Sequence, residues 1–108
     1  MNKKYLSLGI FSDVIEEQTA EEELESKPKF KAYPNPSDGQ VLTVVLSKYQ
    51  PESRFRLDVV DVSGKLIQSV KLGSEVDYME LFDIQPGMYF LILFEDGLRV
   101  ESQRLIVK

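Results

Sequence analysis

Short apolar segments separated by turn residues follow one another from residue 30 to residue 108, and this pattern limits the fold more than any other feature. The turns recur about every ten residues and contain Gly, Pro, Asp, Asn or Ser, which is typical of an all-β sandwich or barrel. A chain of 108 residues is long enough for about one core. We therefore predict an immunoglobulin-like antiparallel β-sandwich of about six or seven strands, which needs no helix to close its core.

Two segments are apolar on both faces of the predicted strand. Residues 41–46 read VLTVVL, as expected for a strand that is covered on two sides or that lies inside a sandwich. Residues 88–94 read MYFLILF, an unbroken apolar run that is unsuited to facing water on either side. We expect this second segment to be the central strand.

The segment at residues 54–60, RFRLDVV, alternates instead. Its apolar side chains should face the core, while Arg54, Arg56 and Asp58 should face water. The following DVSGK predicts a hairpin turn in which Gly64 supplies the positive φ, and KLIQSV then returns as the partner strand.

The remaining segments continue this pattern. GSEVD at residues 73–77 predicts a loop, and YMELFDI at residues 78–84 predicts a strand. In the QPG that follows, Pro86 and Gly87 favour a reversal into the apolar run. EDG at residues 95–97 predicts another hairpin turn, after which the last strand or strands complete the sequence.

A stiff corner, YPNPSDG, precedes the first full strand. Its two prolines have no N–H to donate and restrict the residues before them, so a preceding segment cannot continue into the sheet as a regular element. Ser37 and Asp38 then favour a turn. We predict a structural role for this corner as a domain-boundary turn formed by Tyr33, Pro34, Asn35, Pro36 and Gly39.

The first 29 residues have a different composition. MNKKYLSLGIF matches an export signal only weakly, because Ser7 and Gly9 dilute its apolar stretch and no A-x-A site follows. Glutamates dominate residues 16–25, which favours a solvated linker. We predict an acidic N-terminal segment or linker, with this weak match to an export signal, at residues 1–29 and the β-sandwich domain at residues 30–108.

Charge and composition exclude several classes of function. The net charge of −5 disfavours a nucleic-acid surface, which needs clustered Lys and Arg. The sequence contains no histidine and no cysteine, which removes disulfides, the common zinc sites and histidine-based catalysis. No segment approaches the roughly 18 apolar residues that a membrane-spanning helix needs.

The carboxylates that remain lie mostly in turns, where backbone geometry explains them. The alternative is a divalent ion held at Asn35 and Asp38, although the usual calcium-loop pattern is missing. A dyad of Ser63 and Lys65 sits in a turn that already demands small and polar residues. We therefore expect no enzyme activity, no metal and no cofactor.

Four blocks of the sequence together resemble a known family. They are YPNPSDG at 33–39, DVSGKLI at 61–67, LFDIQPGMYFLIL at 81–93 and RLIVK at 104–108. In order and spacing they are similar to the successive blocks of the type IX secretion system C-terminal sorting domain (type A, Por secretion family). The resemblance covers about residues 30–108 and implies a protein of Bacteroidetes-type bacteria that is secreted, or reaches the outer membrane and cell surface, by way of the periplasm.

The resemblance also implies the partners. They are an outer-membrane translocon, a shuttle protein and a sortase-like peptidase that commonly removes the domain; no nucleic acid and no small-molecule substrate is implied, and membrane contact is only through partners. Cleavage is expected between about Thr19 and Lys31, because peptidases act on exposed unstructured backbone.

On the matching positions, the resemblance implies recognition through a G-x-Y block and the terminal basic-apolar block. These blocks contain Gly87, Tyr89, Arg104, Leu105, Ile106, Val107 and Lys108. A partner could take the terminal strand as an added strand at a sheet edge, or bind it through an end carboxylate.

Other interpretations of the same residues remain open. The hydroxyl of Tyr89 also suits a tyrosine corner, and residues 105–107 suit ordinary strand packing. Because only about thirty residues precede the domain, the alternative function is a free-standing immunoglobulin-like binding or structural module of a bacterial cell-surface complex.

Overall fold

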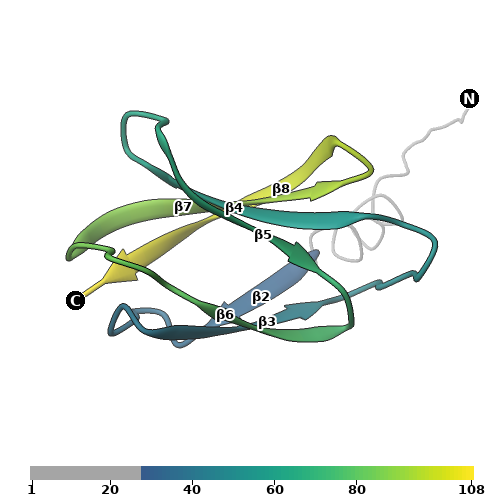
Figure 1. Ribbon diagram of the computed structural model, residues 1–108, viewed down its shortest axis with the longest axis horizontal. Coiled ribbons are helices and arrows are strands. Elements are labelled where there is room, and N and C mark those ends of the chain that lie inside the picture. The colour runs from purple at the N-terminus through teal and green to yellow at the C-terminus, as the bar shows by residue number, and fades with distance from the viewer. Residues whose placement is uncertain (1–27) are drawn as a thin grey trace, which may run out of the picture.

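The computed structural model describes residues 28–108, and every regular element among them is a β-strand. The strands form two sheets that face each other (Figure 1). The three-stranded sheet has the order β2-β3-β6 and consists of β2 (Phe30–Tyr33), β3 (Val41–Leu46) and β6 (Val76–Glu80). The four-stranded sheet has the order β5-β4-β7-β8 and consists of β4 (Phe55–Asp61), β5 (Leu66–Leu72), β7 (Gly87–Glu95) and β8 (Leu98–Val107). The predicted all-β sandwich is confirmed, while most of the predicted N-terminal segment lies outside the described residues.

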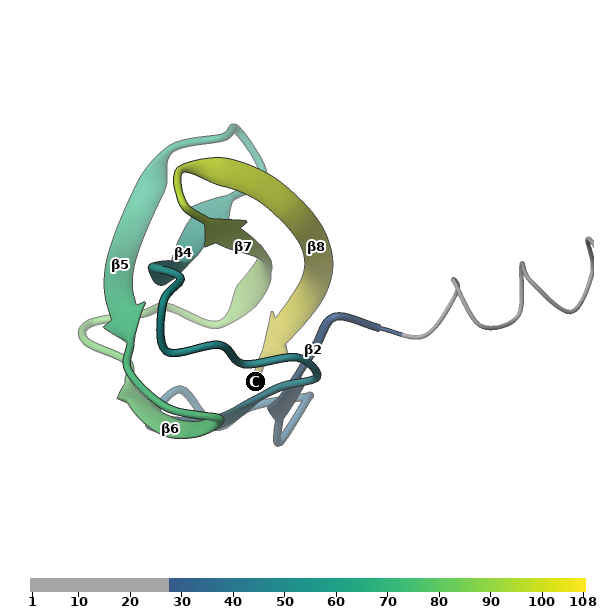
Figure 2. The same ribbon diagram turned by 90° about the vertical axis from the view of Figure 1, so that its right-hand side faces the viewer.

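The core lies between the sheets and is filled by the inward faces of both. Phe30 and Leu42 from one sheet and Leu57, Leu91 and Leu105 from the other are fully buried. Figure 2 shows the four-stranded sheet curving around this core, so that β8 comes down beside β2. The side-chain amide of Gln103 on β8 donates to the carbonyl oxygen of Phe30 at 2.6 Å, which joins the two sheets along this side.

The alternation predicted for β4 is confirmed on its inner face, where the apolar residues are buried. On the outer face, however, Asp58 is only 9% exposed, although it was expected to face water. Its Oδ1 atom lies 3.1 Å from Nε of Arg56 and accepts a hydrogen bond of 2.6 Å from the hydroxyl of Ser69 on β5. A buried carboxylate needs such partners, because burial without them would cost several kcal/mol.

The outer faces of β3 and β7 are partly exposed, which contradicts the two-sided cover predicted for β7 and leaves, for β3, the alternative of a strand inside a sandwich. On β3, Val41 is 44% exposed. On β7, Tyr89 and the other inward residues are buried, but Met88 is 40% exposed and Phe90, Ile92 and Phe94 are half-buried. The reason is that the outward side chains are covered only by neighbours within the same sheet. β7 nevertheless lies between β4 and β8, as expected for a central strand.

The predicted hairpin turns are confirmed at both sites. Gly64 has φ 89° between β4 and β5, and Gly97 has φ 82° between β7 and β8. The loop predicted at residues 73–77 is shorter, since β6 already begins at Val76, and the strand predicted at residues 78–84 ends at Glu80. Gly87 is not in a tight reversal but is the first residue of β7. The connection before it crosses from one sheet to the other, which takes more residues than a tight turn.

Candidate recognition surface on the terminal strand

The structure divides the sequence-predicted recognition residues into buried and exposed ones. Leu105 and Val107 point into the core with 0% and 3% exposure. Arg104 and Lys108 are exposed, and Ile106 is half-buried. This division follows from strand geometry, because successive side chains of β8 point to opposite faces. Only the outward residues are accessible to a partner while the domain stays folded.

Tyr89 is one of the buried recognition candidates. It is 9% exposed, and its hydroxyl donates a 2.6 Å hydrogen bond to the carbonyl oxygen of Gln85, four residues earlier. This bond ties the connection from β6 to the start of β7. The arrangement matches the tyrosine-corner interpretation, in which the ring packs in the core and the hydroxyl bonds to the backbone.

The outer edge of β8 is occupied near its end by the corner that precedes β3. The Asn35 side chain donates through Nδ2 to the carbonyl oxygen of Arg104 at 2.8 Å and accepts through Oδ1 from the backbone N–H of Ile106 at 3.1 Å. The backbone N–H of Ser37 donates to the carbonyl oxygen of Ile106 at 2.7 Å, and the carbonyl oxygen of Ser37 accepts from the N–H of Lys108 at 2.8 Å. We call these four bonds the corner clamp.

Local bonds shape the corner itself. Ser37 is fully buried, and its hydroxyl oxygen accepts from the N–H of Gly39 at 2.9 Å, while Oδ1 of Asp38 accepts from the N–H of Gln40 at 3.0 Å. Gly39 has φ 84°, a conformation that glycine adopts without the steric cost of a Cβ atom. The peptide bonds before Pro34 and Pro36 are both cis. A turn is present here, but it connects the paired strands β2 and β3 within the domain, and it also contacts the other end of the domain.

An apolar and basic surface lies on the outer face of β7 and β8 beside the clamp. Met88 is the direct cross-strand partner of Ile106, and Phe90 is the partner of Arg104. We call these four residues the terminal patch. Sequence reasoning missed Met88 and Phe90 because it treated their apolar run as covered on both faces. The sequence feature that could have identified them is their position directly before and after Tyr89, because adjacent residues of a strand point to opposite faces.

The acidic and polar turn residues are engaged with the backbone. Oδ1 of Asn35 and of Asp38, the alternative metal ligands, each accept a backbone N–H, and no cluster of three metal-binding side chains occurs within residues 28–108. In the Asp61 turn, hydrogen bonds from the Ser63 hydroxyl and the Lys65 N–H hold the pKa of the Asp61 carboxyl below its usual value of 3.8. None of the described segments forms a helix long and apolar enough to cross a membrane.

Comparison with known proteins gives one family. The model of the family described as secretion system C-terminal sorting domain matches residues 31–108, which is most of the chain. No curated protein matches. This is a family of type IX sorting signals and not a family of enzymes, and such a signal implies a secreted or cell-surface protein that is exported by way of the periplasm and interacts with the type IX machinery. The chain therefore belongs to the family of secretion system C-terminal sorting domains, as its four sequence blocks predicted.

Proposed function

We propose that residues 30–108 are a folded sorting domain whose terminal patch, together with Lys108, is read by the type IX translocon or its shuttle protein. One observation carries this proposal. Within the terminal block, Leu105 and Val107 are buried, whereas Arg104 and Ile106 are accessible beside Met88 and Phe90. Alternate residues of the terminal block thus serve the core and the accessible surface, so that strand packing and recognition can both use this block.

The chemistry of the patch suits a protein partner. Aromatic, Met and Arg side chains are enriched at protein interfaces, and a few such residues supply most of the binding energy. The matching surface would present an apolar pocket for Met88 and Ile106 and a carboxylate for Arg104.

Addition of a partner strand is the less favoured mode of recognition. That mode needs unpaired backbone groups on a sheet edge. Along the last residues of β8 the outward backbone groups already bond to Asn35 and Ser37. A partner strand at this position would first have to displace the corner clamp. Side-chain recognition on the outer face needs no such displacement.

The proposed cleavage by a sortase-like peptidase then falls on the N-terminal side of Pro28. The carbonyl oxygens of Pro28 and Lys29 accept hydrogen bonds from Ser47, at 2.6 Å from its hydroxyl and 2.9 Å from its N–H. A peptidase needs backbone that it can extend into its active site. We therefore narrow the expected region to residues between Thr19 and Lys27 and propose that residues 28–108 stay together as the domain.

The export test fuses residues 28–108 to a reporter that carries a signal peptide and measures surface display in a type IX-competent strain. Display is expected there and not in a translocon-deficient strain. Deletion of residues 104–108 is a poor control, because it also removes Leu105 and Val107 from the core. The informative variant is Arg104→Gln with Ile106→Thr, which changes only outward side chains.

The matched control makes similar chemical changes on the other sheet, as Lys31→Gln with Val41→Thr, since both residues are exposed there. Loss of two recognition contacts, at about 1.4 kcal/mol for each factor of ten, should reduce display about tenfold or more in the patch variant. Circular dichroism checks that both variants are folded. Equal display by the two folded variants would reject the terminal patch, and failure of the unaltered fusion would reject the sorting function and favour a free-standing binding module.

A further inference from the structure

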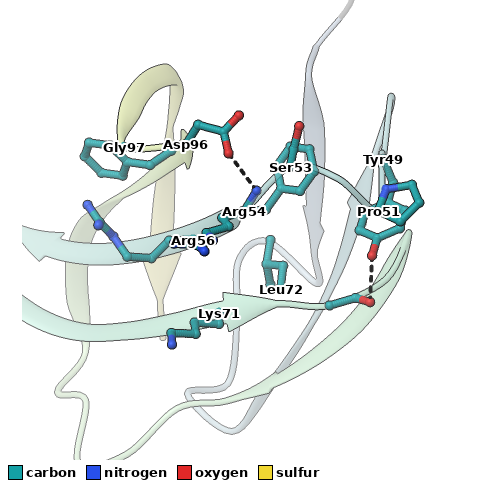
Figure 3. A pocket seen from close by; sticks show the side chains of 12 residues that line it. Tyr49, Pro51, Ser53, Arg54, Arg56, Lys71, Leu72, Asp96 and Gly97 are labelled. Carbon is teal, nitrogen blue, oxygen red and sulfur yellow. Dashed lines mark hydrogen bonds between the residues drawn. The ribbon is translucent and has the colours of Figure 1, made fainter.

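A groove of about 920 Å³ lies at the end of the four-stranded sheet opposite the terminal patch. Its walls include Tyr49, Arg54, Phe55, Arg56, Lys71 and Phe94. Figure 3 shows Arg56 and Lys71 on the neighbouring strands β4 and β5, with Tyr49 and Pro51 at the far end of the groove. The Tyr49 hydroxyl donates to the carbonyl oxygen of Gly73 at 3.0 Å, which holds this ring in place. The groove thus combines fixed aromatic surface with cationic groups.

The cations of the groove are held close to one another. Arg56 and Lys71 are direct cross-strand partners, and two like charges in this relation destabilise a sheet. The Arg56 guanidinium is fixed from two sides, by Nε against Asp58 and by its position 4.1 Å from the centre of the Phe94 ring. Because Asp58 contacts Nε, the two terminal amino groups are the part of Arg56 that an anion would meet.

The carboxylate within the groove does not neutralise these cations. Asp96 lines the groove and accepts the backbone N–H of Arg54 through Oδ1 at 2.9 Å. Together with Asp58, which pairs with Arg56, it sets two negative charges against the three positive charges of Arg54, Arg56 and Lys71. An anionic ligand bridging Arg56 and Lys71 would relieve their repulsion and form charge-assisted hydrogen bonds.

The charges of the chain are divided unevenly between its two parts. Residues 28–108 contain 10 basic and 11 acidic side chains, so they are close to neutral. Residues 1–27 contain three lysines and seven acidic side chains, which supplies four of the five net negative charges. Six of these acidic residues are glutamates within residues 16–25. The chain thus carries its own complement to the basic groove.

The chain enters the domain at the same end as the groove. Pro28 and Lys29 are bonded to Ser47, and the loop that follows Ser47 supplies Tyr49 and Pro51 to the groove wall. Figure 1 shows the beginnings of β2 and β4 at one end of the sandwich. A stretch of seven residues spans up to about 23 Å when extended. Each residue from Glu21 to Glu25 lies within seven residues of Pro28, so an extended stretch of this length is available at the end of the domain where the groove lies.

We propose that the groove binds an acidic stretch of polypeptide and that its occupant is the glutamate-rich segment at residues 16–25 of this same chain. Glutamate carboxylates bridge Arg56 and Lys71, while Leu24 supplies an apolar contact for the aromatic wall. This inference is independent of the sorting function, because it concerns a different end of the domain and only charges within the chain.

Paramagnetic NMR on the full chain tests the proposal. The sequence has no cysteine, so Ala20→Cys gives one site for a nitroxide label. Backbone signals of residues 54–56 and 71–73 should lose intensity at low salt. They should recover in about 1 M NaCl, where the Debye length is only about 3 Å. Arg56→Gln with Lys71→Gln should restore most of the lost intensity, whereas Lys65→Gln, a charge change in the distant hairpin turn, should not.

A second labelled variant leaves the sandwich unaltered and replaces Glu21, Glu22, Glu23 and Glu25 by Gln. It should give the same recovery, which separates loss of binding from any loss of folding in the groove variant. Equal signal loss over both sheets, or loss that persists in both charge variants, would overturn the proposal. A further sample mixes nitroxide-labelled chains that lack ¹⁵N with ¹⁵N-enriched chains that lack the nitroxide. Signal loss in this mixture would show that the segment binds the groove of a second copy, and it would overturn binding within one chain.

Discussion

Two turns of this domain use the same chemistry over different distances. At the hairpin turn, Asp61 Oδ1 accepts three hydrogen bonds, from the N–H and hydroxyl of Ser63 and from the N–H of Lys65, all within four residues. At the corner clamp, Asn35 bonds to Arg104 and Ile106, about seventy residues away. The first turn joins two neighbouring strands, whereas the second fixes the end of the last strand to the beginning of the domain.

The two turns also differ in the burial of the strand segments that they hold. The hairpin turn is exposed, and the strand that leaves it begins with Leu66, which is 54% exposed. The corner clamp holds a strand segment that contributes Leu105 and Val107 to the core. Local hydrogen bonds thus set the direction of the chain, while the long-range ones seal a core. Breaking the clamp should cost more stability, although in both turns an Asx side chain accepts backbone N–H groups.

The largest expected effect concerns one leucine on the strand that each turn holds, Leu105 at the corner clamp and Leu66 at the hairpin turn. Leu105→Ala should lower the free energy of unfolding by about 3 kcal/mol, because it leaves a cavity in the core. Leu66→Ala should lower it by less than about 1 kcal/mol, because the side chain is mostly in water already. Urea unfolding of both variants measures the difference. Similar losses for the two variants would mean that the end of β8 is not part of the core.

The next effect concerns the clamp itself. Asn35→Ala should cost about 2 kcal/mol, because it removes two hydrogen bonds and leaves backbone groups of Arg104 and Ile106 without these partners. Hydrogen exchange should show faster exchange at the Ile106 N–H and unchanged exchange at the centre of β4. In the matched variant, Asp61→Ala, the faster exchange should be confined to residues 63–65. If Asn35→Ala leaves the exchange at Ile106 unchanged, the clamp does not protect this edge.

A smaller effect compares two glycines with nearly the same backbone conformation. Gly39 and Gly64 have φ 84° and 89°, so alanine at either position should cost about 1 kcal/mol through backbone strain. Their surroundings differ. A Cβ atom at Gly39 would lie 3.4 Å from Cγ1 of Val107, whereas at Gly64 nothing lies within 4 Å. The methyl NMR signals of Val107 should therefore shift in Gly39→Ala and stay in place in Gly64→Ala. If the Val107 signals do not shift in either variant, Gly39 in the corner does not contact Val107 on β8.

The smallest effect is the pH dependence from the hairpin turn. The Ser63 hydroxyl, followed by the Lys65 N–H, lowers the pKa of Asp61 in the folded protein, so the carboxylate form stabilises the fold above the unfolded pKa. This contribution is lost as the pH falls through the lowered pKa, at values below 3.8. Asp61→Asn should remove it, and urea midpoints from about pH 7 to about pH 2 measure the change. If the urea midpoint depends on pH in the same way in Asp61→Asn as in the unaltered protein, these hydrogen bonds do not favour the ionised form of Asp61.

Most of the fold could be predicted from local patterns. Strand alternation identified the inward face of β4, and Gly64 marked a turn whose hydrogen bonds all lie within its own sequence neighbourhood. The error on β7 arose because a second layer of structure was assumed to cover its outer face. Met88 and Phe90 were assigned to a covered face. Whether other segments cover the outer face of a strand depends on the tertiary structure and not on the amino-acid sequence of that strand.

The candidate site was likewise only partly predictable from the sequence. Sequence identified the block at residues 104–108 and the corner at residues 33–39, because each has a distinctive composition. It did not place them in contact, and it assigned a structural role to one and recognition to the other. A hydrogen bond between Asn35 and Ile106 leaves no trace in either segment alone, since an Asn side chain also suits many local turns.

The sequence by itself determined the β-strands, the hairpin turns and membership of a sorting-domain family, because these follow from residue order over short distances. The tertiary structure alone decided that Leu105 and Val107 are core residues, that Arg104 and Ile106 are accessible, and that Asn35 and Ser37 close the edge of β8. The physical reason is that burial and long-range hydrogen bonds depend on which segments meet when the two sheets close on each other.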